Sequence, residues 1–357
     1  MLKYLNDDHF IKNLQSEAKR KKAVIGFDGF VDSIVRPIRS VGSADTEEKS
    51  VYFDTIKQFG EYLMGQSGKS CSVGLDVHSR QLGGNMPYLS RALGGLGIDV
   101  SCIGMLGGNG QVDPLFQNMP CTLYPFAEPG QSTCLEFTDG KVMLAPEYAL
   151  TSSPWDLVNT AAGGKATELF KSADLITLVN WSELDFSHAL WQAVYDNVLE
   201  GFGSEANASN VDKTRYAFFD LCDCSRKSAA EIHSVLTLIG KFAKKRTAVL
   251  SLNENESHII SEKLLEAGLC ACEIGTQLRA HYGIDEVLIR ATHDCTLITN
   301  QAITHLPTLH VKEPKILTGA GDNFNAAYCF GLLMGLSDQK RLQFSCEFTS
   351  EYIKHGI

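Results

Sequence analysis

Residues 318–322 read T-G-A-G-D and combine the residue types of an anion-binding site. Gly319 and Gly321 carry no Cβ atom and permit unusual backbone angles, so the N–H groups around Ala320 can converge on one point. The residues that follow place apolar side chains at helical spacing and predict a helix. The converging amides would lie at its N-terminus, whose unpaired N–H donors and positive dipole end favour a bound anion, phosphate above all.

The carboxylate of Asp322 has two interpretations. It can cap the helix that it begins, as acidic residues often do. Alternatively, it can take a proton from a hydroxyl that attacks a phosphate, because phosphoryl transfer needs a general base beside an anion hole. These five residues alone do not decide between the two.

Such a site needs a scaffold, and the chain alternates between strand-like and helix-like segments. The apolar run at residues 23–27 predicts a buried strand, and residues 99–107 predict another. Further predicted strands lie at 174–181, 215–223, 246–254, 286–292 and 295–300. Because helix candidates separate most of them, we predict a mainly parallel central sheet with helices on both faces.

Two segments do not fit this sheet. Residues 36–80 are more polar and contain an amphipathic helical stretch. Residues 121–148 have alternating apolar positions around Asp139-Gly140, which is a strong hairpin signal. We predict that both segments form a small β lid beside the core.

The composition limits the function. The chain has 357 residues, is 44% hydrophobic and 21% charged, and carries a formal net charge of -10. It can bury a sizeable core, and its one basic block at residues 19–22 is too small for binding nucleic acid. It has no run of about 18 apolar residues, so no membrane span is expected. The polar N-terminal segment does not resemble a signal peptide, and we expect a cytoplasmic protein.

The eleven cysteines favour reduced thiols. Two C-x-C pairs stand out, Cys222 with Cys224 and Cys270 with Cys272. Four thiolates could hold zinc, but zinc ligands more often have the spacing C-x(2–4)-C. We therefore expect buried free thiols at both pairs.

Three motifs occur in order along the chain: L-G-G-N-M-P-Y-L-S-R-A-L-G-G-L-G, S-L-N-E-N-E-S and L-T-G-A-G-D-N-F-N-A-A-Y. Neither a P-loop nor a dinucleotide fingerprint accompanies them. Together the three motifs resemble those of the ribokinase-like carbohydrate kinases, the PfkB family. The resemblance covers nearly the whole chain. It implies a single α/β domain, a three-layer Rossmann-like sandwich with a mainly parallel central sheet and a small β lid.

The resemblance implies a role for each matching residue of the C-terminal motif. Asp322 corresponds to the catalytic base of the family. The anion hole corresponds to Gly319, Ala320 and Gly321. Thr318 corresponds to the residue that leads into the hole, beside the nucleotide phosphates.

Two further groups of residues match the family. Asn253 and Glu256 correspond to residues that organise Mg²⁺ near the phosphates. Mg²⁺ commonly keeps several waters, so an amide and a carboxylate can act on it through water.

The substrate-binding turn of the family corresponds to Gly83, Gly84 and Asn85. Glycines allow the backbone to approach a polyol closely, and the asparagine side chain offers both a donor and an acceptor. Asp32 matches the acid that holds substrate hydroxyls, and Asp28 lies nearby on the same run and is a second candidate. Taken alone, either acid could equally belong to a turn.

The chain departs from the family in the nucleotide region. A stretch that is normally Gly-rich reads I-R-A-T-H-D here and contains Arg290, which can still pair with phosphate. The last helix also lacks the family's usual residues beside the adenine. These departures leave the identity of the nucleotide donor open.

The resemblance implies a carbohydrate kinase that transfers the γ-phosphate of ATP to a hydroxyl of a sugar or sugar-like substrate, with Mg²⁺ as cofactor and a monovalent cation as a further candidate. Family members often pair through their lids, so a homodimer is one expected assembly. Two alternatives stay open. The acceptor can be a nucleoside or another small alcohol, or the chain can be a ligand-binding regulator that has lost catalysis.

Overall fold

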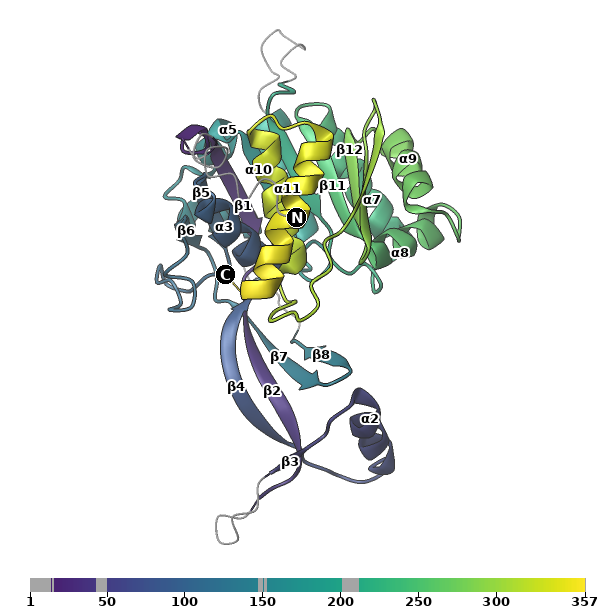
Figure 1. The fold of residues 1–357 in the computed structure, drawn as a ribbon. Coiled ribbons are helices and arrows are strands. Elements are labelled where there is room, and N and C mark those ends of the chain that lie inside the picture. Colours follow the sequence, from purple (N-terminus) through teal and green to yellow (C-terminus); the bar gives the residue numbers. More distant parts are fainter. Residues whose placement is uncertain are drawn as a thin grey trace.

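A computed structural model describes residues 14, 16–42, 50–146, 150, 153–200 and 212–356 of the chain. These residues form two sheets, one of nine strands and one of five. Figure 1 shows the large sheet with its helices as the main body and the small sheet as a lobe that extends from one end of it. None of the helices in this part of the chain combines the length and the apolar character needed to cross a membrane.

The large sheet is mainly parallel, as the sequence predicts. Its strands, in spatial order, are β14 (Ile303–Pro307), β13 (Asp294–Ile298), β12 (Glu286–Arg290), β11 (Thr247–Asn253), β10 (Tyr216–Asp220), β9 (Leu175–Val179), β1 (Lys22–Phe27), β5 (Asp99–Gly104) and β6 (Thr122–Pro125). The pairs from β6 to β12 are parallel, and β13 and β14 add an antiparallel edge.

Helices cover both faces of this sheet and produce three layers. One face packs against α3 (Asn85–Gly95), α10 (Ala320–Leu333) and α11 (Asp338–His355). The other face packs against α4 (Pro154–Ala161), α5 (Ala166–Ser172), α6 (Ser187–Val194), the π-helix η1 (Tyr195–Glu200), α7 (Ala229–Ala243), α8 (Glu254–Leu264) and α9 (Ala271–Tyr282).

Strand β9 shows why the sequence produces three layers. All five of its side chains are buried. Ile176 and Leu178 belong to the core on the side of α4 to α9, whereas Leu175 and Val179 belong to the core on the side of α3, α10 and α11. Because successive strand residues point to opposite faces, a strand whose side chains are all buried requires helices on both sides.

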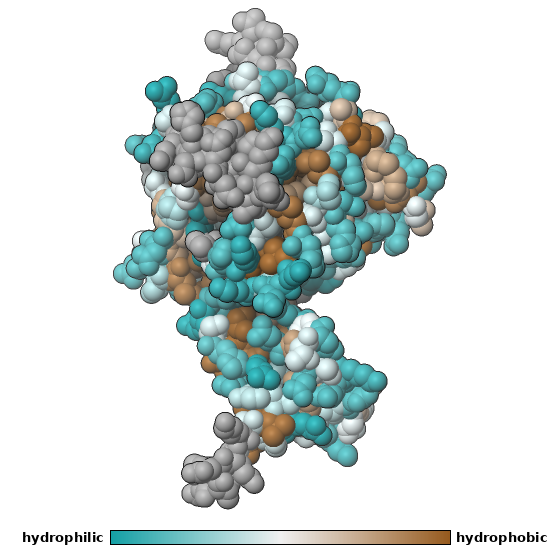
Figure 2. All heavy atoms as spheres, viewed as in Figure 1, coloured by the Kyte–Doolittle hydropathy of each residue, from teal (hydrophilic) through white to brown (hydrophobic). Residues whose placement is uncertain are grey.

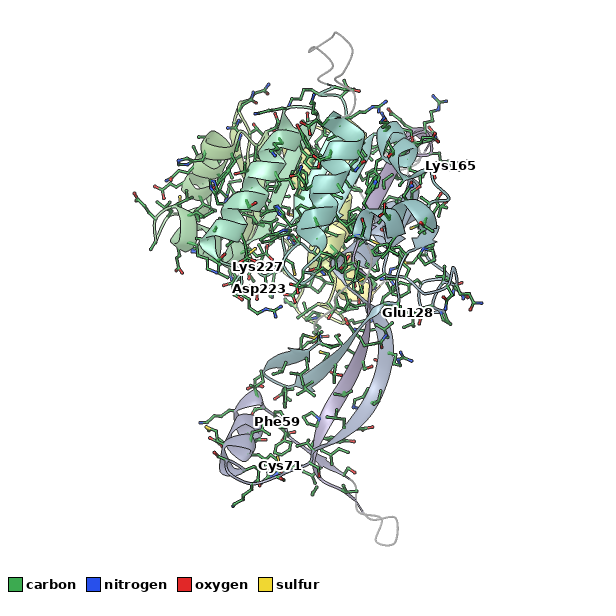
Figure 3. All side chains as sticks on the ribbon, turned by 180° about the vertical axis from the view of Figure 1, so that it is seen from behind. Phe59, Cys71, Glu128, Lys165, Asp223 and Lys227 are labelled. Carbon is green, nitrogen blue, oxygen red and sulfur yellow. The ribbon has the colours of Figure 1, made fainter. Side chains whose placement is uncertain are left out.

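The small sheet contains β2 (Phe30–Ser40), β3 (Val51–Tyr52), β4 (Gly74–Gly83), β7 (Gly130–Phe137) and β8 (Gly140–Leu144). The predicted hairpin is present, with Phe137 paired to Gly140. Helix α2 (Ile56–Gly65) packs on this sheet, with the ring centroids of Phe59 and Phe137 5.6 Å apart. The lobe therefore has a hydrophobic cluster of its own, and Figure 3 shows Phe59 within it.

The lid segments differ in extent from the ranges that the sequence indicates. The first begins with β2 at Phe30, before residue 36, because β2 is one continuous strand that leads from the end of β1 into the small sheet. Residues 122–125 form β6 of the large sheet, so the second segment joins the small sheet only at Gly130. Polarity indicated which segments are exposed, but the partner strand decides which sheet a segment joins. Residues 43–49 and 147–148 lie outside the described residues.

All eleven cysteines are free, as expected. The expected burial holds for Cys224 alone, because Cys222 and Cys272 are half-buried and Cys270 is exposed. Cys270 and Cys272 lie at the N-terminus of α9, in the outer helical layer. In the described part of the chain, no cluster of three or more His, Cys, Asp or Glu side chains is arranged to hold a metal ion.

Candidate functional site

The site begins where β1 ends, at the hinge between the large sheet and the lid. Asp28 follows β1 directly and is completely buried. Its carboxylate accepts hydrogen bonds from the backbone N–H groups of Asn85 at 2.7 Å and Met86 at 2.8 Å. The side-chain amide of Asn180 donates a third, at 2.7 Å. Asp28 thus joins β1 to the start of α3 and to the end of β9.

Burial raises the pKa of Asp28 to about 6, although its three donors each act to lower it. Loss of water around the carboxylate therefore outweighs the hydrogen bonds.

Gly83 and Gly84 make room for two carboxylates. A Cβ atom on Gly83 would overlap the carboxylate of Asp32, and one on Gly84 would overlap that of Asp28. Gly84 also has a φ of 85°, which favours glycine. Asp32 lies on β2 and is 6% exposed, and it accepts a hydrogen bond of 2.5 Å from the hydroxyl of Ser132 on β7. The predicted Gly-Gly-Asn turn and both predicted acids therefore meet at the hinge.

The T-G-A-G-D stretch starts α10. Its N-cap is Gly319, whose φ of 79° lies in the left-handed region, and a Cβ atom there would overlap the ring of Tyr88. Because Gly319 is the N-cap, Asp322 lies inside the first turn and is not the cap. Burial, then the nearby carboxylate of Asp220, raises the pKa of Asp322 well above its usual value. The Asn85 side chain and the guanidinium of Arg290 act in the opposite direction.

Arg290, at the end of β12, lies against this helix start. Its Nε donates to the hydroxyl of Ser251 at 3.0 Å, and its Nη2 contacts the carboxylate of Asp220 at 3.1 Å. A Cβ atom on Gly321 would lie 2.5 Å from Nη1 of Arg290. The glycine therefore lets a guanidinium approach the N-terminal turn of α10, where its charge adds to the positive end of the helix dipole.

Asp220 was not identified in the sequence analysis. It ends β10, is 2% exposed, and also accepts a hydrogen bond of 2.7 Å from the side-chain amide of Asn325 on α10. Figure 3 shows Asp223 and Lys227, which follow β10, at the end of the main body that faces the lid. An acid at the end of an apolar strand was the available signal, since such strand ends meet at one edge of a parallel sheet.

Asn253 and Glu256 bind each other at the start of α8. The amide side chain of Asn253 donates to Glu256 at 2.6 Å, and the two backbone N–H groups complete a capping box with bonds of 2.8 Å. Burial, followed by the charge of Asp220, raises the pKa of Glu256 to about 7, against the effect of Arg290. The Asn-x-x-Glu motif therefore starts a helix here and also places a buried carboxylate beside Asp220.

The lid contributes Lys141, which the sequence analysis also missed. Its Nζ on β8 donates to the hydroxyl of Thr318 at 3.1 Å and lies 4.0 Å from Glu136. The carbonyl of Thr318 accepts a hydrogen bond of 2.7 Å from the hydroxyl of Tyr352 on α11. The lid thus contacts the residue that precedes the helix start. Lys141 directly follows the Asp-Gly hairpin turn, but no local pattern shows that this turn reaches α10.

Asn180 is a third residue that the sequence analysis missed. It follows β9 with a φ of 57°, which is uncommon for a residue other than glycine. Its Nδ2 binds Asp28, whereas its buried Oδ1 has no hydrogen-bond partner among the described residues. A buried acceptor without a donor is costly and can be satisfied by a bound ligand.

Comparisons with known proteins agree with this architecture. A family model described as prokaryotic ketohexokinase matches residues 8–357. A ketohexokinase of Haloferax volcanii is 22% identical over 348 residues, which cover 94% of this chain and 87% of that protein.

Solved structures share the fold at low identity. Ribokinase from Thermotoga maritima has a TM-score of 0.60 at 13% identity and covers 94% of this chain and 93% of its own. The nucleoside kinase of Burkholderia thailandensis, solved with inosine, has a TM-score of 0.57 at 14% identity. The match covers 94% of this chain and 91% of that kinase. Ribokinase from Arabidopsis thaliana, solved with ribose and ATP, has a TM-score of 0.58 at 14% identity. The match covers 93% of this chain and 92% of that ribokinase. These likenesses establish the ribokinase-like fold.

The raised pKa of Asp28 predicts a specific dependence of stability on pH. Because its pKa is higher in the folded chain, the folded state binds its proton more tightly than the unfolded state between pH 3.8 and about 6. Stability from this group is therefore present at low pH and is lost as pH rises through that window. We expect the free energy of unfolding of the wild type, relative to Asp28→Asn, to fall by about 2.4 kcal/mol from pH 4 to pH 7.

Urea unfolding of both proteins at several pH values measures this difference. The comparison cancels the titrating groups whose pKa does not depend on Asp28. A difference that stays constant with pH would contradict the burial of a titrating carboxylate at this position.

Proposed function

This chain belongs to the prokaryotic ketohexokinase family, and from that premise we propose that it transfers the γ-phosphate of ATP to a hydroxyl of a ketohexose. The supporting observation is the position of Asp322. Its buried carboxylate lies in the first turn of α10, beside Asn85 of the substrate turn and near Arg290. A base, an anion site and a polyol-binding turn thus share one place.

We assign Asp322 the role of general base. A raised pKa makes a carboxylate a stronger base, and a base works best when its pKa approaches the working pH. Asp322 would take the proton of the attacking hydroxyl. The amides at Gly319, Ala320 and Gly321 would stabilise the charge on the transferring phosphoryl group, because they lie at the start of α10, where N–H groups lack helical partners. The N–H of Ala320 donates to the carbonyl of Leu317 at 3.1 Å, so it would have to leave that turn to join the other two. Arg290 would add a fixed positive charge beside them.

The acceptor would bind at the hinge. Asp32 uses one oxygen for Ser132 and can accept from a sugar hydroxyl with the other. The free Oδ1 of Asn180 is a further acceptor. Asp28 is completely buried and already accepts from three protein donors, so we assign it to holding the turn in place rather than to direct binding.

The charge of this pocket favours a neutral sugar. Asp28, Asp32 and Asp322 are buried acids on the acceptor side. A phosphorylated sugar would bring a second anion next to these carboxylates, in a site that excludes water and therefore screens charges weakly. This argues for a free ketohexose over a sugar phosphate.

The residues present fit a magnesium ion. Oxygen ligands are what Mg²⁺ prefers, and it is often held by one or two carboxylates together with phosphates and waters. Glu256 and Asp220 supply buried carboxylates, and Asn253 supplies an amide oxygen. When bound, Mg²⁺ would neutralise charge on the phosphates. Thr318 and Arg290 would contact the nucleotide phosphates, and a requirement for a monovalent cation remains a prediction from the resemblance.

A homodimer through the lids also remains a proposal. Strand β4 pairs with β2 on one side, and Leu75 and Val77 on it are 45% and 57% exposed. Figure 2 shows hydrophobic side chains on the surface of this lobe. Exposed apolar residues on an edge strand are features of pairing surfaces.

An acceptor screen tests the proposed activity. We expect kcat/KM for a ketohexose to exceed that for aldohexoses, sugar phosphates and nucleosides by about tenfold or more, because buried acceptors reject ligands that leave them unpaired. Coupled ADP release with ATP and then GTP as donor gives the ratios. A nucleoside that outcompetes every sugar would replace the proposed acceptor, and no ADP release with any acceptor would favour a silent regulator.

The role of Asp322 gives a second prediction. Asp322→Asn should lower kcat by about a hundredfold or more while the ketohexose dissociation constant changes little, because the change removes a proton acceptor and keeps the size of the side chain. Turnover and calorimetric binding measure the two effects separately. Turnover near that of the wild type would remove Asp322 from the role of base.

Lys141 gives a third prediction. Lys141→Met should lower kcat/KM by roughly tenfold, because it removes a positive charge that the lid brings beside Thr318 and the phosphate site. Lys141→Arg should recover much of the loss. The matched control is Lys57→Met on α2 of the same lid, whose side chain is 82% exposed and forms only a surface pair with Glu61. Equal losses in Lys141→Met and Lys57→Met would show that lid charge in general matters, not this contact.

A further inference from the structure

The C-x-C pair at the start of α9 is a reactive feature that the kinase site does not use. The Sγ atoms of Cys270 and Cys272 lie 2.7 Å apart. Cys270 is exposed and Cys272 is half-buried, so solvent reaches the pair. We propose that Cys270 and Cys272 form a redox-active dithiol, which becomes an intrachain disulfide by exchange with a small-molecule disulfide.

The start of α9 holds the two thiols together. Cys270 is the N-cap, and its backbone N–H donates to the carboxylate of Glu273 at 2.8 Å, which fixes the first turn. The hydroxyl of Thr276 donates to the carbonyl of Cys272 at 2.7 Å. Residues two apart at a helix start can bring their Cα atoms within the roughly 4.4–6.8 Å that a disulfide allows. The thiol of Cys272 and the carboxylate of Glu273 raise the pKa of Cys270, although the backbone N–H of Glu273 acts to lower it.

The exchange proceeds in two balanced steps. The thiolate of Cys270, the more exposed residue, attacks one sulfur of the small disulfide, forms a mixed disulfide and releases one thiolate. The thiolate of Cys272 then attacks the Cys270 sulfur and releases the second thiolate. The two thiol protons end on the two released thiols. The dithiol loses two electrons, and the small disulfide gains them.

The chain carries a matched control for this chemistry. Cys222 and Cys224 have the same spacing, but Cys224 is buried, and its thiol donates to the backbone carbonyl of Cys222 at 3.3 Å. This second pair therefore lacks both the exposure and the sulfur–sulfur contact of the first. If spacing alone governed oxidation, the two pairs would behave alike.

A redox titration of the full chain tests the proposal. The protein is equilibrated with graded ratios of oxidised to reduced glutathione, trapped with iodoacetamide and digested with trypsin. Cleavage after lysine and arginine places the two pairs on separate peptides, residues 264–279 and 216–226. We expect the peptide of residues 264–279 to escape alkylation and to become lighter by two hydrogen atoms, as a disulfide requires. At the same ratio of oxidised to reduced glutathione, its oxidised fraction should exceed that of the peptide of residues 216–226 by about tenfold or more.

Cys272→Ser should instead retain glutathione on Cys270, because the second step is lost. Two outcomes would overturn the proposal in the unmodified chain. One is alkylation of both thiols across the whole range of ratios, and the other is a stable glutathione adduct on Cys270. Kinase activity is not part of the readout, so the result does not depend on the proposed function.

Discussion

The carboxylate of Asp28, enclosed by three donors, is the interaction on which the geometry of the site depends. It binds two backbone amides at the start of α3 and the side chain of Asn180 after β9. Through it, the first strand holds both the substrate turn and a neighbouring strand end. Gly84 must lack a side chain for that carboxylate to fit, and Gly83 does the same for Asp32. The buried acids therefore require glycine at both positions of the turn.

A second constraint is the concentration of acid at one edge of the sheet. The buried carboxylate of Asp220 lies close enough to raise the pKa of both Glu256 and Asp322, and Arg290 acts on both in the opposite direction. Burying several like charges is unfavourable unless they are paired, protonated or bound to cations. Arg290 supplies one positive charge directly, through its contact with Asp220. The remaining negative charge can be reduced by protonation, which agrees with the raised pKa of Glu256 and Asp322, or by a bound cation.

The lid is attached to this edge by short connections. Only two residues separate β1 from β2, and Asp28 is one of them. The lid nevertheless has a small core of its own, in which α2 covers Phe53 and Phe137. A lobe that is packed internally and hinged at the site can move as a unit, and such motion is how kinases exclude water during transfer. The contact of Lys141 with Thr318 links the lid to the residue that precedes α10.

The sequence by itself determined β1, β5, the strands from β9 to β13, the Asp-Gly hairpin and the glycine-rich start of α10, because apolar periodicity and glycine placement are local signals. Only the tertiary structure decided which residues complete the site. Lys141 meets Thr318 across 177 positions and Asp220 meets Asn325 across 105, distances over which no local pattern carries information. Asp322 shows the division most clearly. Its position in the motif left both cap and base open, and the fold removed the cap by giving that place to Gly319 and burying the carboxylate beside other charges.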